Sequence, residues 1–509
     1  MDGSRLLGRL FGVRAEQVDP GADGPAEAPG MPGPAGVTVV GGGIAGMSAA
    51  VVLAERGVRV TVLEGAPRLG GRLSARPESL PDGTSQLVDH GFHAFFRQYY
   101  NWRAILRRID PGLGFLRPVD GYPVLSADWP PEEFGRLPAA PPANLLALLA
   151  RSPSLRLRDL RDIDRRAALP LLAYDPERTH RDHDGASARQ LLDRLHLPDR
   201  ARAMLFEVFA HSFFNHEADL SAAELIAAFH FYFLGNPEGL AFDAPDLDHD
   251  SAIWRPLAAH AERRGAVVHT GDPAVEVRPG WRVDTAAGRT HRSAFLVLAV
   301  DPPALRDLLA ASPRLAAAAP VLAGQVAAAG VGPPYAVARF WFGGDVAPGR
   351  SVFSGVSRQP TLDSITLYHR LERGARRWAD RVGGSVVELH AYACPDLPAP
   401  VLADRMRAEL AALWPETAGL PVIDLRAETG ARAPAFRPGT AAGRPGVRTD
   451  ADRLYLAGDG IHTDLPSALM ERAAATGITA ANHVLRRLGA AAEPLRSVRP
   501  RGLLAGRRG

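Results

Sequence analysis

The amino-acid sequence predicts a two-domain α/β fold in which a discontinuous parallel-sheet domain alternates with an α+β domain. A strand, a glycine-rich turn, a helix and a second strand follow one another within residues 37–64. Residues 99–257 then have the pattern of helices, and alternating strands and helices return from residue 261. The chain has 509 residues, which at roughly 150 residues per domain leaves room for two domains with insertions.

The composition is that of a globular protein with a large core. Hydrophobic residues make up 46% and charged residues 23% of the chain, which excludes a disordered chain, a coiled coil and a collagen-like fibre. Cys394 is the one cysteine, so an intrachain disulfide and a cysteine-based metal site are excluded. The 59 basic residues include no lysine, which excludes a lysine Schiff base. No basic–aromatic module accompanies the arginines, so nucleic-acid binding is not predicted.

Both ends of the chain are predicted to be flexible. Residues 1–36 become rich in Pro, Gly and Ala, and residues 487–509 are rich in arginine and broken by Pro and Gly. Residues 5–14 could instead form a short amphipathic turn at a membrane surface. No run approaches the roughly 20 apolar residues that cross a bilayer, and no signal-peptide pattern opens the chain. We therefore expect a cytoplasmic protein.

The first ordered unit carries a phosphate-binding pattern. Residues 37–40 form a β-branched run typical of a buried parallel strand, and Gly41, Gly43 and Gly46 follow it with the spacing G-x-G-x-x-G. The first glycine allows a tight turn, the second lets a pyrophosphate approach the backbone, and the third lets the helix pack on the strand.

The residues around this turn complete a Rossmann-type dinucleotide site. The helix that begins near Ile44 and Ala45 would present free N–H groups and a positive dipole end to the phosphates. Residues 58–63 form the second strand, and Glu64 ends it, where a carboxylate can accept hydrogen bonds from a ribose diol.

NAD and FAD both bind to such a unit, and two further motifs distinguish between them. The string Arg68-Leu-Gly-Gly-Arg72 follows Glu64, and Gly458-Asp459 follows a predicted strand near the end of the chain. Together with the glycine motif they resemble the FAD-binding pattern of the amine oxidase and carotenoid desaturase superfamily. The resemblance implies a two-domain, glutathione-reductase-like flavoprotein with non-covalently bound FAD.

The same resemblance implies roles for individual residues. Gly70, Gly71 and Arg72 would lie against the pyrophosphate and the flavin, with Arg72 neutralising phosphate charge. Asp459 would hold the ribityl-side hydroxyls or a phosphate. The helix that begins near Met470 would point its N-terminus at the flavin pyrimidine. The backbone of Val275 would contact the adenine.

Three longer strings narrow the resemblance to one branch of the superfamily. Residues 89–101, 386–392 and 464–477 are similar to isorenieratene synthases, which are β-carotene desaturase/methyltransferases, and the likeness runs over residues 37–486. It implies desaturation of a carotenoid β-ionone ring with methyl migration, which gives an aromatic ring. A desaturase or isomerase of another polyene and an amine oxidase-like flavoenzyme are the alternatives. The absence of lysine counts against the latter, since amine oxidases of the superfamily typically hold a water near flavin N5 with a lysine.

The candidate proton-transfer residues are His90, His93, Glu388 and His390. By the resemblance, His90 and His93 lie where the chain passes the flavin, and Gly91 would let the backbone approach the ring. Each histidine could act as an acid or base, or could be structural. The histidine spacings do not match a metal-binding motif, so no metal is predicted.

The resemblance also predicts the domain boundaries. An FAD domain would comprise residues 37–100, 258–320 and 430–486, and a substrate domain residues 101–257 and 321–429. Residues 145–150, with arginines at 151, 156 and 158, could touch the inner face of a membrane or form a core helix. The oligomeric state is left open. Aromatic side chains of the middle region could line a tunnel or pack as core: Phe206, Phe209, Phe213, Phe214, Phe229, Phe231, Tyr232 and Phe233.

Overall fold

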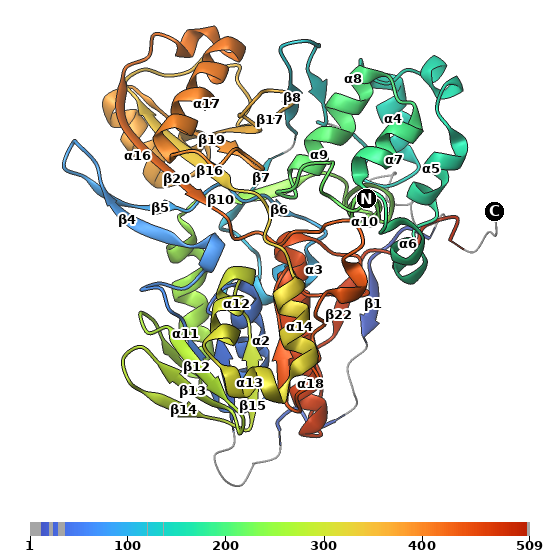
Figure 1. The fold of residues 1–509 in the computed structure, drawn as a ribbon. Coiled ribbons are helices and arrows are strands. Elements are labelled where there is room, and N and C mark those ends of the chain that lie inside the picture. The colour runs from blue at the N-terminus through green and yellow to red at the C-terminus, as the bar shows by residue number, and fades with distance from the viewer. Residues whose placement is uncertain (1–11, 20–23, 29–35, 120, 136, 506–509) are drawn as a thin grey trace.

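A computed structural model of the protein confirms the predicted α/β fold (Figure 1) and describes residues 12–19, 24–28, 36–119, 121–135 and 137–505. One end of the molecule is built on a five-stranded parallel sheet in the order β11-β3-β2-β15-β21. Its central strands are wholly buried, as expected for a parallel sheet covered on both faces. The strands are β2 (Val37–Val40), β3 (Val60–Leu63), β11 (Val267–His269), β15 (Phe295–Leu298) and β21 (Leu454–Leu456).

Two helices with very close packing accompany this sheet. Helix α2 (Ile44–Glu55) follows the glycine turn, and α18 (Leu469–Arg487) packs against it. A Cβ atom on Gly477 would lie 2.2 Å from the carbonyl oxygen of Ala45, so this helix contact requires glycine. The surrounding elements are α11 (Arg255–Arg263), β12 (Ala274–Arg278), β13 (Arg282–Thr285), β14 (Thr290–Arg292), α12 (Pro302–Ala310), α13 (Pro313–Ala318) and α14 (Pro320–Ala328).

A seven-stranded mixed sheet forms the second layer, in the order β20-β16-β19-β18-β17-β8-β9. Helices α16 (Arg373–Val382) and α17 (Ala399–Leu413) pack against it. The strands are β8 (Pro123–Leu125), β9 (Glu132–Glu133), β16 (Tyr335–Phe342), β17 (Phe353–Val356), β18 (Ser364–Leu367), β19 (Ser385–Ala391) and β20 (Val422–Gly430).

Between the two sheets run the hairpin β4 (Ala75–Ser79)–β5 (Ser85–Asp89) and the small sheet β6 (Phe95–Phe96), β10 (Phe242–Pro245) and β7 (Leu116–Val119). Helices lie beside them: α3 (Tyr100–Leu106), α4 (Ala143–Arg151), α5 (Arg165–Leu172), α6 (Pro176–His183), α7 (Ala188–Leu195), α8 (Asp199–Ala201), α9 (Val208–His211), α10 (Ala222–Phe229) and α15 (Tyr368–Leu371). Within the described ranges, the structure contains no helix that is both long and apolar enough to cross a membrane.

Parts of both predicted tails take part in the fold, within the ranges 12–19, 24–28 and 487–505 that the structure describes. Strand β1 (Glu16–Asp19) pairs antiparallel with β22 (Leu495–Ser497), so the two ends of the chain form one ribbon. Val498 is fully buried, and the carbonyl of Arg499 lies 2.7 Å from Nε2 of His230. Buried apolar side chains and backbone pairing therefore order a segment that its composition alone marked as flexible. Most of the predicted amphipathic turn at residues 5–14 lies outside the described residues.

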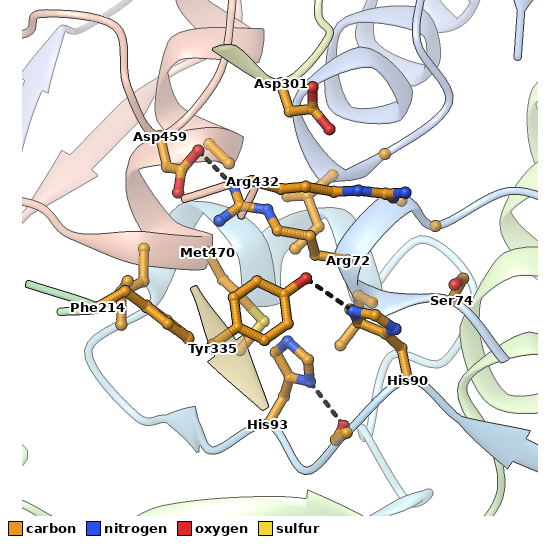
Figure 2. A pocket seen from close by; sticks show the side chains of 18 of the residues that line it. Arg72, Ser74, His90, His93, Phe214, Asp301, Tyr335, Arg432, Asp459 and Met470 are labelled. Carbon is orange, nitrogen blue, oxygen red and sulfur yellow. Dashed lines mark hydrogen bonds and ion pairs between the residues drawn. The ribbon is translucent and has the colours of Figure 1, made fainter. Parts of the chain in front are cut away.

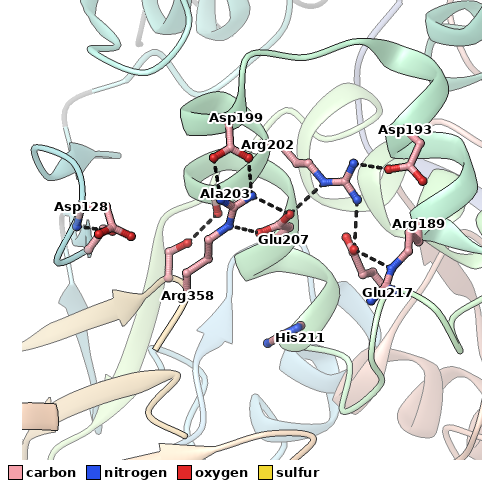
Figure 3. A network of polar contacts seen from close by, with 12 residues as sticks. Asp128, Arg189, Asp193, Asp199, Arg202, Ala203, Glu207, His211, Glu217 and Arg358 are labelled. Carbon is pink, nitrogen blue, oxygen red and sulfur yellow. Dashed lines mark hydrogen bonds and ion pairs between the residues drawn. The ribbon is translucent and has the colours of Figure 1, made fainter. Parts of the chain in front are cut away.

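A cluster of ion pairs connects the helical segment at residues 199–217 to the second sheet (Figure 3). Arg358, just after β17, binds Asp199 at 2.7 Å and Glu207 at 2.8 Å. Arg202 binds the same Glu207 at 2.8 Å and Glu217 at 3.0 Å. We call these five residues the Arg358 cluster. It connects residues 199–217 to the end of β17, two segments that both contribute residues to the cavity described next.

Candidate functional site

A cavity of about 580 Å³ lies between the two sheets. Its floor is formed by the residues that follow the carboxyl ends of four strands of the parallel sheet, the position where open α/β sheets bind ligands. The predicted cofactor residues that line it are Gly41, Gly43, Ile44, Ala45, Glu64, Gly70, Gly71, Arg72, Gly91, Gly458, Asp459 and Met470. Gly46 lies one helical turn deeper, beneath this surface.

The glycine turn has the shape that a phosphate group requires. Gly41 has a φ of +106°, and a Cβ atom there would lie 2.3 Å from the carbonyl oxygen of Ala299. A Cβ atom on Gly46 would lie 1.9 Å from the carbonyl oxygen of Gly41. Gly43 differs from both, because its Cβ would meet only the carbonyl oxygen of Gly70, at 3.8 Å. Space is therefore left open at the one glycine that a pyrophosphate would touch.

Glu64 is held at the end of β3 by two backbone N–H groups. Its Oε2 accepts a hydrogen bond from Gly42 at 2.7 Å, and its Oε1 accepts one from Ala66 at 2.8 Å. Gly42 belongs to the glycine turn, so the carboxylate is fixed beside the phosphate-binding loop. These residues fit the adenosine half of a dinucleotide.

The turn around Gly70 joins the glycine motif to the far end of the chain. Gly70 has a φ of +118° and donates its N–H to the carbonyl of Gly42 at 3.0 Å. Arg72 forms an ion pair with Asp459 at 2.5 Å. Burial opposes the charge of the Arg72 guanidinium, but Asp459 outweighs this effect and raises its pKa. Separate contacts to the cofactor were expected for these two side chains, whereas in the structure they pair with each other.

Residues 90–93 form the wall opposite the glycine turn (Figure 2). The Nδ1 atom of His93 lies 2.8 Å from the carbonyl oxygen of Gly91, and burial lowers the pKa of His93 to about 4. The imidazole is therefore neutral at pH 7. Its Nδ1–H donates to Gly91, and its Nε2 is left as a proton acceptor. His90 lies 3.1 Å from the hydroxyl of Tyr335, and its other nitrogen lies 2.8 Å from Glu428.

His390 lines the cavity, but Glu388 lies behind the wall. The Glu388 carboxylate is fully buried and binds Arg339 at 2.6 Å and His390 at 2.7 Å. It also accepts the backbone N–H of Phe92 at 2.6 Å. Burial works to raise the pKa of Glu388, but Arg339 and His390 overcome it and lower that pKa. Glu388 therefore does not line the cavity itself, and its part in proton transfer, which would act through His390, stays a prediction.

Val275 lies outside the cavity lining, although its neighbours are part of it. Its side chain is 43% exposed, at an irregularity in the β12–β13 pairing. The wall of the cavity at this strand consists of Pro273 and Ala274. An exposed side chain does not test a contact made by the backbone, so the contact of the Val275 backbone with an adenine stays a prediction.

Aromatic side chains make up much of the rest of the wall. Of the predicted group, Phe209, Phe213, Phe214 and Tyr232 line the cavity, whereas Phe206, Phe229, Phe231 and Phe233 pack in the core around it. Further lining residues, which no motif in the sequence marks as such, come from other elements: Tyr99, Tyr122, Phe134, Phe242, Tyr335, Phe353, Tyr392 and the exposed Arg432. No group of His, Cys, Asp and Glu suited to a metal ion occurs within the described residues.

Comparisons with known proteins agree with this geometry. Residues 44–485 match the family of flavin-containing amine oxidoreductases. A carotenoid phi-ring synthase of Streptomyces griseus is 45% identical over 466 residues, which cover 91% of this chain and 90% of that protein. Another phi-ring synthase, from Chlorobaculum tepidum, is 29% identical over 594 residues, or 93% and 92% of the two chains.

Solved structures share the fold at low sequence identity. A putrescine oxidase bound to putrescine has a TM-score of 0.63 and 16% identity, over 89% of this chain and 99% of that one. The cyclohexylamine oxidase of Brevibacterium oxydans has a TM-score of 0.63 and 14% identity, over the same shares. The glycine turn, the cavity at the strand ends and the match over residues 44–485 lead to one conclusion: this chain belongs to the family of flavin-containing amine oxidoreductases.

Proposed function

We propose that the protein is an FAD-dependent oxidoreductase that converts the β-ionone ring of a carotenoid into an aromatic ring, with migration of a methyl group. The observation that carries this proposal is the continuity of the cavity. Its one end is the glycine-rich floor that fits a dinucleotide, and its other end is walled by aromatic side chains. An aromatic, largely apolar wall suits a hydrocarbon, and the relatives with the highest identities reported above are named carotenoid phi-ring synthases.

Several features support FAD, bound without a covalent link. The floor offers an open Gly43, a fixed Glu64 and the N-terminus of α2, which together suit an adenine dinucleotide. Cys394 is buried among the residues that pack on α17, and it does not line the cavity. A flavin held by these residues would supply the hydride acceptor for the reaction.

The chain's own residues would direct the rest of the reaction. Aromatisation of a cyclohexene ring removes four hydrogens, which leave as two hydrides and two protons. Aromatic walls would orient the ring over the floor and exclude water from the cationic stage of the reaction. Neutral His93, with its Nε2 free, is a suitable acceptor for a proton lost from a carbocation, because so strong an acid needs only a weak base.

A peripheral contact with a membrane belongs to the same proposal. Leu146 on α4 is 63% exposed, and Leu157 is 67% exposed. On its other side, α4 packs Leu148 and Leu149 against the hydrophobic cluster that contains Tyr122 and Phe134, which line the aromatic end of the cavity. Exposed leucines beside that end of the cavity, with Arg151, Arg156 and Arg158 around them, would let a hydrocarbon pass from a bilayer into the protein.

Expression in a host that accumulates β-carotene tests the proposal. New aryl carotenoids are the expected product, and the purified protein should be yellow and release FAD on acid denaturation. If the host contains folded, flavin-loaded protein and its pigments are unchanged, the proposed substrate is contradicted. Oxidation of an added amine by the same preparation would favour the amine oxidase alternative.

A further inference from the structure

We propose that Tyr335, His90 and Glu428 form a hydrogen-bonded relay that takes protons from the substrate in the cavity to the protein surface, with Tyr335 as the catalytic residue. This inference rests on the proposed function, because it concerns the protons that aromatisation releases. It assigns a role to Tyr335 and Glu428, two residues that the motifs in the sequence do not single out.

The Tyr335 hydroxyl is held at one place in the cavity (Figure 2). Tyr335 begins β16, and the ring of Phe214 packs edge-on against it at 5.5 Å. Gly430 pairs with Tyr335 on the neighbouring strand β20. A Cβ atom on Gly430 would lie 2.7 Å from the tyrosine oxygen, so the glycine leaves the space that the hydroxyl occupies. A side chain that is fixed in this way is preorganised for one contact.

The charges around the hydroxyl determine the direction of the hydrogen bonds. Partial burial works to raise the pKa of Glu428, but His90 and Arg76 lower it below its usual value, so the carboxylate is ionised at neutral pH. An ionised carboxylate only accepts hydrogen bonds, so Nδ1 of His90 must carry a proton and donate it. In the neutral imidazole, Nε2 then accepts the Tyr335 hydroxyl at 3.1 Å. Burial raises the pKa of Tyr335, so the phenol keeps its proton until the relay acts.

Each proton transfer along this chain balances. A carbon–hydrogen bond of the substrate cation breaks, its electron pair stays in the ring as a new double bond, and the proton passes to the tyrosine oxygen. The hydroxyl proton of Tyr335 moves to Nε2 of His90, which leaves an imidazolium beside the Glu428 carboxylate. A carboxylate that orients a histidine and stabilises its charged form has the same role in hydrolase triads.

The relay also gives the protons a route to solvent, which the contacts of His93 do not provide. Glu428 is half-buried, and Arg76, which binds it at 2.5 Å, is 40% exposed, so the chain of contacts ends at solvent. His93 contacts the Gly91 carbonyl and faces the ring of the buried His249. Since each ring releases two protons, a route to solvent resets the site after each turnover.

Tyr335→Phe tests the inference, with Tyr392→Phe as the matched control. Tyr392 lines the same cavity, but its hydroxyl bonds Ser364 at 3.0 Å. Purified Y335F holoenzyme should keep wild-type FAD content and thermal stability and form aryl carotenoid about 10²–10⁴-fold more slowly, the usual cost of losing an acid–base group. Y392F changes the same wall without touching the relay, so it should slow the reaction far less than Y335F. Rates in D₂O should fall for the wild type and stay unchanged for Y335F.

Two further variants separate the relay from a structural role. Gly430→Ala keeps the tyrosine but displaces its hydroxyl, so it should also slow the reaction with FAD still bound. Glu428→Gln leaves His90 in place without its charged partner, so it should also slow aryl carotenoid formation while FAD stays bound. Wild-type rates for flavin-loaded Y335F or G430A would overturn the inference. A wild-type protein that forms no aryl carotenoid would overturn the proposed function itself, which keeps the two failures distinguishable.

Discussion

In the glycine turn at residues 41–46, Gly43 is the glycine whose Cβ position faces open space. A side chain at this position would therefore compete with a cofactor. Gly43→Val should block the pyrophosphate and yield colourless protein, whereas the fold should persist because the nearest atom to a Cβ lies 3.8 Å away. Flavin content after purification and the far-UV circular dichroism spectrum measure the two effects. Gly324→Ala, in α14 with open space around it, is the control. Full flavin content in G43V would contradict the assignment of the floor.

His93 carries a separate prediction for the proposed reaction. His93→Ala should keep FAD and lower aryl carotenoid formation by about 10²–10⁴-fold. The pKa of His93 is lowered to about 4, so as a base it should work at full strength well below pH 6. Product analysis at several pH values checks both points. Normal turnover by flavin-loaded H93A would make His93 structural and shift attention to His390, which lines the same wall.

Glu471 makes the stability of the protein depend on pH. This buried carboxyl, in the first turn of α18, accepts the backbone N–H groups of Asn101 and Trp102. Burial raises its pKa to about 8, so the folded protein keeps a proton that the unfolded chain releases near pH 4.5. The contribution to stability is therefore complete below about pH 4.5 and is lost as the pH rises to 8.

The change Glu471→Gln should remove this slope. Urea unfolding at pH 5 and pH 8 measures it, and the wild type should lose more free energy of unfolding between these values than the variant. An equal pH dependence of both proteins would show that Glu471 keeps an ordinary pKa in the folded state.

At the scale of single elements, α4 links the cavity to the proposed membrane contact. A double change of Leu146 and Leu157 to Asp should abolish flotation with anionic liposomes, because it replaces exposed apolar side chains by charges that headgroups repel. Val321→Asp, at an exposed valine of α14 that is 58% exposed, is the control and should float like the wild type. Wild-type protein that stays with the soluble fraction at low salt would contradict the contact.

The Arg358 cluster should stabilise the walls of the cavity in a salt-dependent way. Arg358→Met removes the ion pairs with Asp199 and Glu207, and we expect a loss of about 1 kcal/mol in the free energy of unfolding at low salt. The loss should shrink in 1 M salt, where charges are screened beyond about 3 Å. Arg181→Met, which removes one surface pair with Asp182, is the control and should change stability less. A loss that is independent of salt would assign the effect to packing on Trp129.

At the scale of the whole molecule, the elements that could be predicted from the sequence are those formed by neighbouring residues. Strand β2, the glycine turn, α2 and Glu64 follow one another within residues 37–64, so their arrangement is set by neighbouring residues. The start of α18 at Leu469 and the wall at residues 90–93 followed from the family resemblance. All of these residues lie near the cavity as expected.

Contacts between residues far apart in the chain could not be predicted from the sequence, because they depend on strand register and on packing between distant segments. Tyr335 and His90 are 245 positions apart, and Tyr335 reaches the cavity because β16 pairs with β20 in one particular register. The ordered C-terminal segment was missed for the same reason, since β22 pairs with β1 and bonds Asn101, both far away in the sequence. Glu388 was a candidate for proton transfer in the sequence, where no motif shows that the side chain is buried behind the cavity wall.

Because Arg72 pairs with Asp459, the floor of the cavity can be completed only late in the synthesis of the protein. The ribosome adds 387 residues between the two partners, which takes roughly 20 to 80 s at 5–20 residues per second. Throughout that interval the nascent chain has the glycine turn but lacks β21, Asp459 and α18, which complete the floor of the cavity. The floor of the cavity is therefore complete only when nearly the whole chain has been made, so we expect flavin capture late in synthesis or after it.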